Sequence, residues 1–335
     1  MTMKLKVGVV GGGSWGTTVA SLASRHSATM LWARNPDTVK EINEHHTNSK
    51  YLGESKLYSS LVSSESIEEV VSQADVVIMG VPAQSFRKVL LTAKPHIRPW
   101  VPIISLSKGL ERGTKMRMTQ IIEAIMPGHP AGALTGPNLA KEIMAGQAAA
   151  SVLAMVDDTI ANELQKVIAT GLFRIYTNTD VVGCELGGAL KNVIALAAGM
   201  GDGTGAGQNT RAAIITRGLA ELTRLGVAMG GRPLTFSGLA GMGDLVVTCS
   251  SPLSRNRTVG FELGKGRQID EIVNEMSMVA EGVETCSVVR ELAHEYNVYM
   301  PITEEVYKVL HKGNTAFDAF LGLMKHESRS EDDPA

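Results

Sequence analysis

The 335-residue chain is poor in cysteine and in aromatic residues, and it carries almost no net charge. Its three cysteines, Cys184, Cys249 and Cys286, form no C-x-x-C pair, which argues against a disulfide framework and a structural zinc site. We therefore expect no metal and a reducing compartment, the cytoplasm. The formal net charge of −2 gives no overall basic field, so neither nucleic acid nor a membrane surface is an expected partner.

Long apolar runs and histidines are also scarce. We expect no apolar run of the roughly 20 residues that cross a bilayer, and the early start of the first β-prone run leaves no room for a signal peptide. No histidine lies between His129 and His294, so a histidine-based acid–base site is disfavoured, although His294 stays open. Lysine remains, because burial or a neighbouring cation lowers the pKa of an amine towards neutrality.

The most informative stretch that is present is Leu5–Gly16, where a β-prone run enters a G-x-G-x-x-G turn and a helical pattern follows. Gly11 permits the tight turn, Gly13 lets backbone N–H groups approach a pyrophosphate, and Gly16 lets helix and strand pack closely. The helix N-terminus adds unpaired donors and the positive end of a dipole. This context predicts a Rossmann-type dinucleotide-binding unit, and a purely structural turn is the alternative.

The end of the second expected strand indicates which dinucleotide is bound. A ribose 2′-hydroxyl is usually held by a carboxylate about 20 residues past the glycines, whereas a 2′-phosphate needs a cation. Here the strand leads to Arg34, whose guanidinium suits a phosphate or stacks on adenine. NADP(H) is therefore favoured, and the nearby Asp37 leaves NAD(H) possible.

The rest of the chain divides into an α/β part and a helical part. Apolar β-branched runs alternate with helical patterns up to about residue 180, as in a parallel sheet. The expected strands are Leu5–Val10, Thr29–Ala33, Val76–Val81, Pro102–Leu106, Ala131–Leu134, Ala149–Met155 and Phe173–Tyr176. We expect a dinucleotide-binding domain over residues 1–180, a helical substrate domain over 181–325 and a disordered polar tail over 326–335.

Helical periodicity dominates the second part. The expected helices are Cys184–Ala198, Ala212–Met229, Ile269–Met276, Thr285–Glu295, Thr303–Lys312 and Ala316–Met324. The glycine-rich stretch Gly199–Gly207 follows a helix instead of a strand, so we interpret it as a helix stop and loop, with a phosphate cradle as the lesser alternative.

Two lysines stand out by their context. Lys108 follows an expected buried strand, at the sheet end where ligands of open α/β sheets lie, although loop lysines are ordinary. Lys191 lies in a nearly uncharged helical segment, and lysine is rarely buried without compensation. A snorkelling surface side chain is the alternative for Lys191.

The segment Gly241–Arg257 combines glycines, Asp244, hydroxyl side chains and two arginines. Arginine with asparagine and serine suits a phosphate pocket, and a solvated loop with an internal aspartate–arginine pair is an equal alternative. Cys249 has no visible base partner, so we expect it to be a small buried residue.

These features together resemble NAD(P)-dependent sn-glycerol-3-phosphate dehydrogenases of the bacterial type over nearly the whole chain. The matching stretches are Gly11–Thr17, Gly80–Gln84, Ser107–Gly109, Thr135–Ile143, Glu185–Ala195, Ile214–Gly218, Gly241–Gly260 and Val279–Val283. Their order and spacing are far more specific than the glycine turn alone.

The resemblance implies a role for each matching residue. Lys191 would be the general acid in reduction and the general base in oxidation, with Asn192, Asp244 and Thr248 as neighbours. Substrate contacts would come from Lys108, Gly136, Asn138, Ser254, Arg255 and Asn256. The cofactor would be lined by Gly11, Gly13, Ser14, Trp15, Gly16, Arg34, Lys108, Ala140, Arg255, Val279 and Glu281. The family usually has Ser-Phe where this chain has Asn138-Leu139, and Asn138 still offers a hydrogen-bond donor.

The implied reaction is the reversible reduction of dihydroxyacetone phosphate to sn-glycerol 3-phosphate, which supplies the backbone of glycerophospholipids. A homodimer is expected. Two alternatives stay open: a lysine-dependent dehydrogenase of β-hydroxyacid type that takes carboxylate substrates, and an NADP(H)-binding regulator without turnover.

Overall fold

The computed structural model describes residues 5–276 and 280–325, which form two compact units. The first unit contains the chain up to Ser107 and Met116–Val181, and the second contains Lys108–Lys115 and the chain from Val182 onward. The expected tail 326–335 and Val279 lie outside the described residues.

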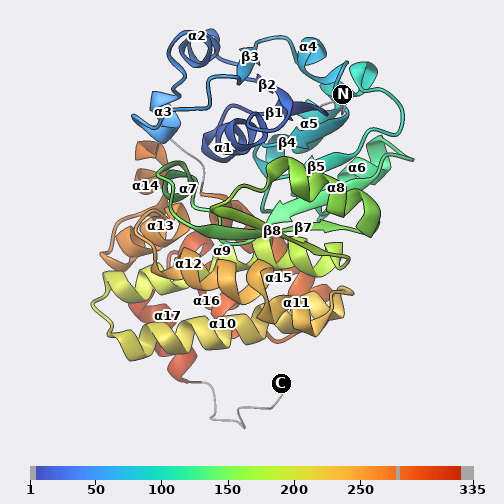
Figure 1. The fold of residues 1–335 in the computed structure, drawn as a ribbon. Coiled ribbons are helices and arrows are strands. Elements are labelled where there is room, and N and C mark those ends of the chain that lie inside the picture. The colour runs from blue at the N-terminus through green and yellow to red at the C-terminus, as the bar shows by residue number, and fades with distance from the viewer. Residues whose placement is uncertain (1–4, 277–279, 326–335) are drawn as a thin grey trace. The chain divides into compact units, whose positions relative to one another are not determined.

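The first unit is built on one eight-stranded sheet (Figure 1). Its strands are β1 (Lys6–Val10), β2 (Ala28–Trp32), β3 (Val62–Ser64), β4 (Val76–Met79), β5 (Ile103–Ser105), β6 (Ala131–Thr135), β7 (Ala149–Met155) and β8 (Phe173–Asn178). The order is β3-β2-β1-β4-β5-β6-β7-β8. The order of the first six strands is that of a dinucleotide-binding sheet, so the predicted fold class is confirmed.

Two details of the sheet differ from the prediction. β3 was not predicted, because its three residues, Val-Ser-Ser, carry little apolar signal. β7 runs antiparallel to β6, with Thr135 opposite Val152, whereas all the other pairs are parallel. An apolar run reports that a strand is buried and does not report its direction.

Helices cover both faces of this sheet. They are α1 (Ser14–Ala23), α2 (Pro36–His45), α3 (Ser49–Leu52), α4 (Ile67–Val71), α5 (Ala83–Ala93), α6 (Met118–Ile125), α7 (Ala140–Met144) and α8 (Asp158–Ile168), with a 3₁₀ turn at Lys94–His96. One buried cluster joins sheet residues to Val19 of α1 and Leu164 of α8. A second cluster joins the sheet to Phe86 of α5 and Ile121 of α6. This double burial explains why every residue of β4 is apolar and buried.

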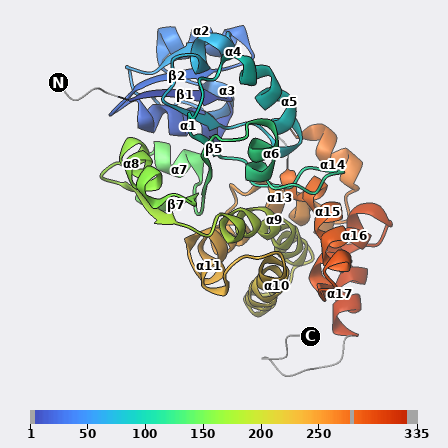
Figure 2. The same cartoon turned by 90° about the vertical axis from the view of Figure 1, so that its right-hand side faces the viewer.

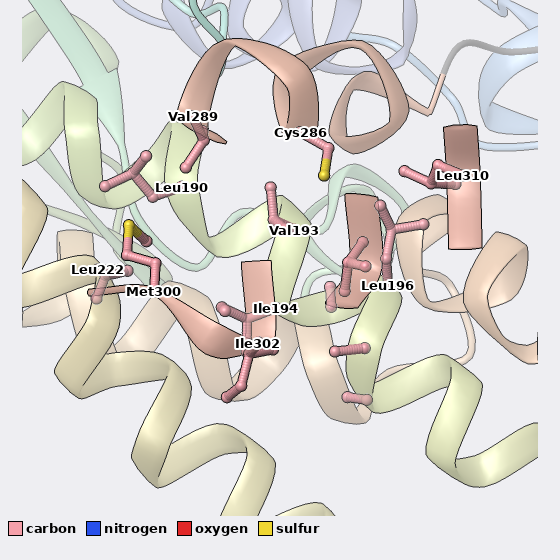
Figure 3. Packing of buried hydrophobic residues seen from close by; sticks show 14 of the residues in the cluster. Leu190, Val193, Ile194, Leu196, Leu222, Cys286, Val289, Met300, Ile302 and Leu310 are labelled. Atoms are coloured by element: carbon pink, nitrogen blue, oxygen red, sulfur yellow. The ribbon is translucent and has the colours of Figure 1, made fainter. Parts of the chain in front are cut away.

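The described residues of the second unit form helices and the loops between them, without a strand (Figures 1 and 2). Its helices are α9 (Val181–Gly203), α10 (Gln208–Ala228), α11 (Pro233–Ser237), α12 (Asp244–Ser250), α13 (Arg255–Gly264), α14 (Ile269–Glu275), α15 (Glu281–Glu295), α16 (Pro301–His311) and α17 (Ala316–Met324), with a π-helical turn at Leu239–Gly243. Apolar side chains of α9 form its core, where Val193 and Ile194 lie among residues of α10, α15 and α16 (Figure 3).

Helix α9 corrects two expectations. It is long and apolar enough to cross a membrane, yet 94% of its most apolar window is buried, so it is a core helix. It also continues to Gly203, through residues interpreted as a helix stop. A Cβ at Gly199 would come within 2.1 Å of Arg257 O, and one at Gly203 within 2.2 Å of Phe261 O. These glycines let α13 lie directly against α9.

Candidate active site

A buried ammonium, carboxylate and hydroxyl meet in the helical unit. Lys191 Nζ, on α9, lies 2.5 Å from Asp244 Oδ1 and 2.5 Å from Thr248 Oγ1, both on α12. The Thr248 hydroxyl donates to the main-chain oxygen of Asp244, 2.6 Å away, so its oxygen is available to accept from the amine. Lys191, Asp244 and Thr248 are 4%, 1% and 7% exposed. The amine of Lys191 is therefore held at a fixed point, away from bulk water, by two oxygen acceptors.

Glycines bring these two helices close enough to make the contact. Gly187 lies one turn before Lys191, and a Cβ there would come within 2.6 Å of Ala240 O in the π-helical turn. Gly241 in that turn lies against α11 instead, since its Cβ would reach 2.1 Å from Phe236 O. The π-helical turn therefore packs closely against α9. Because α12 begins directly after this turn, its first residue, Asp244, lies close to α9.

Lys108 binds the second oxygen of the same carboxylate. Its Nζ lies 2.8 Å from Asp244 Oδ2, and its side chain is 14% exposed. Burial lowers the pKa of Lys108 to about 8, and the Lys191 ammonium adds to that effect, while Asp244 and Glu281 oppose it. Two amines thus share one carboxylate, which leaves the cluster with a net positive charge when both are protonated.

The segment that carries Lys108 is anchored in the helical unit by its own side chains. Leu110 is fully buried in the apolar core of that unit. Asn192 Nδ2 donates to the main-chain oxygen of Lys108 at 3.3 Å, and Arg112 pairs with Glu284 of α15 at 2.7 Å. The ion pair is largely exposed and contributes little, so the buried leucine is the main anchor.

The start of α13 presents a second polar group. Ser254 caps this helix by accepting from the Arg257 amide at 3.3 Å. Asn256 Oδ1 accepts from the Gly282 amide at 2.9 Å, at the start of α15, and the Arg255 side chain is exposed. A Cβ on Gly282 would lie 2.8 Å from both Asn256 Oδ1 and the main-chain oxygen of Asn192. The helix starts of α13 and α15 therefore lie beside Asn192, next to Lys191.

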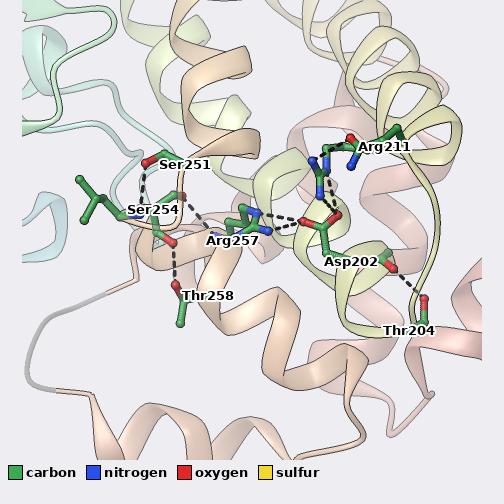
Figure 4. A network of polar contacts seen from close by, with 10 residues as sticks. Asp202, Thr204, Arg211, Ser251, Ser254, Arg257 and Thr258 are labelled. Carbon is green, nitrogen blue, oxygen red and sulfur yellow. Dashed lines mark hydrogen bonds and ion pairs between the residues drawn. The ribbon is translucent and has the colours of Figure 1, made fainter.

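The other arginine of this segment has a different environment. Arg257 pairs with Asp202 of α9 at 2.7 Å, and Arg211 of α10 lies 2.5 Å from the same carboxylate (Figure 4). The two arginines expected in a phosphate pocket therefore lie in different surroundings, because Arg257 pairs with Asp202 whereas the Arg255 side chain is exposed. The alternative of a solvated loop is wrong, since Asp244–Ser250 and Arg255–Gly264 are helices.

The glycine turn of the sheet unit has the geometry of a phosphate cradle. Gly11 has φ 129°, and its Cβ would lie 2.3 Å from Gly80 O. A Cβ on Gly16 would lie 2.0 Å from Gly11 O, whereas one on Gly13 meets nothing within 4 Å. No hydrogen bond to another described residue is donated by the amides of residues 12–15, and the first turn of α1 has no acidic residue. These donors fit the pyrophosphate of a dinucleotide.

The remaining predicted cofactor and substrate residues are distributed between the two units. Arg34 is exposed just after β2, and Gly136 (φ 114°) and Asn138 follow β6. Ala140 is the first residue of α7, and Glu281 is the first residue of α15 in the helical unit. Most of the described residues expected to contact the dinucleotide therefore lie in the sheet unit. Lys108, Arg255 and Glu281 lie in the helical unit.

Two other groups with potential chemistry lie apart from the lysines. Burial raises the pKa of the Cys249 thiol to about 12, so this cysteine is a small buried residue, as expected. His294, which the sequence left open, is 64% exposed and faces Glu304 at 3.8 Å.

Three residues of the site region were missed by sequence reasoning. Leu110, Gly282 and Asn48, whose amide contacts the glycine turn, act through contacts with distant segments. The short G-x-E-T pattern that begins at Gly282 and the apolar residue after Lys108-Gly109 were visible in the sequence, but the segments that they contact were not.

A doubly wound dinucleotide-binding unit and a helical unit with a lysine–aspartate–threonine cluster define an NAD(P)-dependent dehydrogenase. Family models agree: residues 6–161 match the NAD-dependent glycerol-3-phosphate dehydrogenase N-terminus and residues 180–320 match its C-terminus. The chain belongs to this family of glycerol-3-phosphate dehydrogenases, and it is an oxidoreductase.

Relatives support the assignment over nearly full length. A glycerol-3-phosphate dehydrogenase of the NAD(P)+ type from Sphingopyxis alaskensis is 59% identical over 99% of this chain and 100% of its own. Its counterpart from Mycobacterium tuberculosis is 54% identical over 95% of this chain and 94% of its own. The crystal structure of glycerol-3-phosphate dehydrogenase from Coxiella burnetii has a TM-score of 0.92 at 33% identity, covering 96% of this chain and 99% of its own.

Proposed function

We propose that this protein reversibly reduces dihydroxyacetone phosphate to sn-glycerol 3-phosphate, with Lys191 as the acid–base group. The observation that carries this role is the buried hydrogen bonding of Lys191 to Asp244 and Thr248, in a chain of this family. A bound nicotinamide supplies or accepts the hydride at C2 of the substrate. In reduction the Lys191 ammonium donates a proton to the oxygen at C2, and in oxidation the neutral amine takes it back.

The neighbouring residues set the charge and orientation of that proton donor. Asp244 and Thr248 hold Nζ in one place, so that the proton lies along a defined direction. Lys108, on the other oxygen of Asp244, adds positive charge that favours a phosphorylated substrate. Arg255, Ser254 and Asn256 at the start of α13 would bind the phosphate group, together with Asn192, and Gly136 and Asn138 would complete the substrate contacts.

The cofactor contacts follow the glycine turn. The free amides of residues 12–15 would bind the pyrophosphate, and Arg34 would bind the 2′-phosphate of NADP(H), which we propose as the favoured cofactor over NAD(H). The product would supply the backbone of glycerophospholipids in the cytoplasm. A homodimer is proposed, because α17 exposes the apolar side chains of Phe317, Phe320 and Met324. Light scattering, which measures the molar mass in solution, tests this.

Initial rates of NADPH and NADH oxidation, with and without dihydroxyacetone phosphate, test the reaction. Substrate-dependent oxidation is expected, and the ratio of the two rates tests Arg34. Lys191→Ala is expected to lower kcat by at least about 10²–10⁴-fold. Lys312→Ala, which changes an exposed lysine of the same unit, is expected to keep wild-type turnover.

Two results would contradict the proposal. Near-native turnover of Lys191→Ala would remove this lysine from the chemistry. A folded protein that binds the cofactor but oxidises neither NADPH nor NADH with this substrate would favour a regulator, or a dehydrogenase that small carboxylates inhibit and phosphates do not.

A further inference from the structure

Asn48 is a fully buried side chain that hydrogen-bonds the glycine turn of the sheet unit. It lies immediately before α3, and its Nδ2 donates to Gly12 O at 3.0 Å and to Thr17 Oγ1 at 2.9 Å. Asn48 and Thr17 are both 0% exposed. One amide group therefore ties the turn to the first helical turn of α1.

The bond to Gly12 O fixes the direction of the next amide. The described chain has no cis peptide bond, and in a planar trans peptide the carbonyl and the following N–H point in opposite directions. Because Asn48 holds the Gly12 carbonyl on the buried side, the Gly13 N–H must point away from it. This amide donates no hydrogen bond to another described residue, so it is available to a ligand.

The neighbouring peptides of the turn are held by other contacts. The Gly11 amide donates to Trp32 O at 3.0 Å, and the Gly13 carbonyl accepts from the Thr17 amide at 2.9 Å. Without Asn48, the Gly12–Gly13 peptide would have glycine on both sides and no other hydrogen bond from a described residue to its carbonyl, so it would rotate readily. The buried amide is thus the contact that selects one of the two peptide orientations.

We propose that Asn48 is a positioning residue for cofactor binding, which orients the Gly12–Gly13 peptide so that its N–H faces the pyrophosphate of the dinucleotide. This inference rests on the proposed cofactor role of the glycine turn. Asn48 itself does not touch the cofactor, and it acts through the backbone of Gly12 and the side chain of Thr17.

The test compares three variants with the wild type by fluorescence titration of NADPH. Asn48→Ala removes both hydrogen bonds, and Asn48→Asp keeps the shape but replaces the donor by an oxygen that faces Gly12 O. Both are expected to raise the Kd for NADPH about tenfold. The KM for dihydroxyacetone phosphate at saturating NADPH is expected to stay within about twofold, because the lysine cluster lies in the helical unit. A purely structural role predicts lower thermal stability without this separation of Kd and KM.

Asn43→Ala is the matched control. Asn43 makes two side-chain hydrogen bonds to the main chain of Ser63 in the same unit, at 2.9 and 2.8 Å, and does not contact the turn. Its loss is expected to leave the Kd unchanged. Folded Asn48 variants that bind NADPH within about twofold of the wild type would overturn the inference, as would equal weakening in Asn43→Ala. If Asn48→Ala does not fold, the isosteric Asn48→Asp decides. A wild-type protein that binds neither NADPH nor NADH would refute the proposed function itself.

Discussion

Replacing Glu221 by glutamine is predicted to change how the stability of this protein depends on pH. Glu221 lies on α10 and is 1% exposed, and its carboxylate caps the start of α16. It accepts from the Ile302 amide at 2.6 Å, from the Thr303 amide at 3.2 Å and from the Thr303 hydroxyl at 3.1 Å. Burial raises the pKa of Glu221 from 4.5 to about 7, against the opposing effect of these hydrogen bonds and of Arg224.

The direction of the effect follows from the protons bound in each state. Between pH 4.5 and about 7 the folded protein holds a proton at Glu221 that the unfolded chain has lost. The free energy of unfolding therefore falls as the pH rises through this range. The difference of about 2.5 between the two pKa values corresponds to about 3 kcal/mol, with each pKa unit equal to about 1.4 kcal/mol.

Urea unfolding of the wild type and Glu221→Gln, measured at several values between pH 4.5 and 8, tests this prediction. Glutamine keeps an oxygen acceptor for α16 and cannot ionise. The free energy of unfolding of the wild type should fall relative to that of the variant by about 3 kcal/mol across the range. A constant difference would show that Glu221 ionises at the same pH in both states and would refute the reasoning.

Two further changes test the start of α13. Arg255→Ala is predicted to raise the KM for dihydroxyacetone phosphate about 10- to 100-fold with a smaller effect on kcat, because a charge-assisted contact with the phosphate is lost. The control is Arg267→Ala, since the Arg267 guanidinium pairs with Glu262 and Glu275. An unchanged KM for Arg255→Ala would exclude the contact. Gly282→Ala is predicted to displace Asn256, because its Cβ would lie 2.8 Å from Asn256 Oδ1, and to lower kcat/KM about tenfold and stability by about 1–3 kcal/mol. Wild-type kinetics and thermal stability for Gly282→Ala would show that the two helix starts move apart without consequence.

The sequence predicted those features that are set by local pattern. The β1–turn–α1 unit follows from an apolar run, three spaced glycines and a helical pattern within about 20 residues. Strand Ala149–Met155 and helix Ala316–Met324 match the prediction to the residue. The context of Lys191 also sufficed, because a lone charge in an apolar helix needs a compensating partner.

Features set by contacts between distant segments could not be predicted. Lys108–Lys115 belongs to the helical unit, because Leu110 packs into an apolar core formed by residues much later in the chain. Glycines near the end of α9 look like a helix stop, and their packing role depends on α13. The cap that Glu221 makes on α16 and the hydrogen bond from Asn48 to Gly12 likewise join segments whose pairing no local pattern predicts.

In the proposed mechanism, the lysine cluster supplies the acid–base group that histidine supplies in many dehydrogenases. An exposed amine has a pKa near 10.4 and exchanges protons poorly at neutral pH. Burial brings the pKa of Lys108 down to about 8, and Asp244 binds an amine on each carboxylate oxygen, so neither charge is left unpaired. Counted with Asp244 alone, the two ammonium groups leave one net positive charge, and Glu281 also acts electrostatically on Lys108. In the proposed reaction, the phosphorylated substrate would bring the negative charge that these two ammonium groups attract, in addition to any contact from α13.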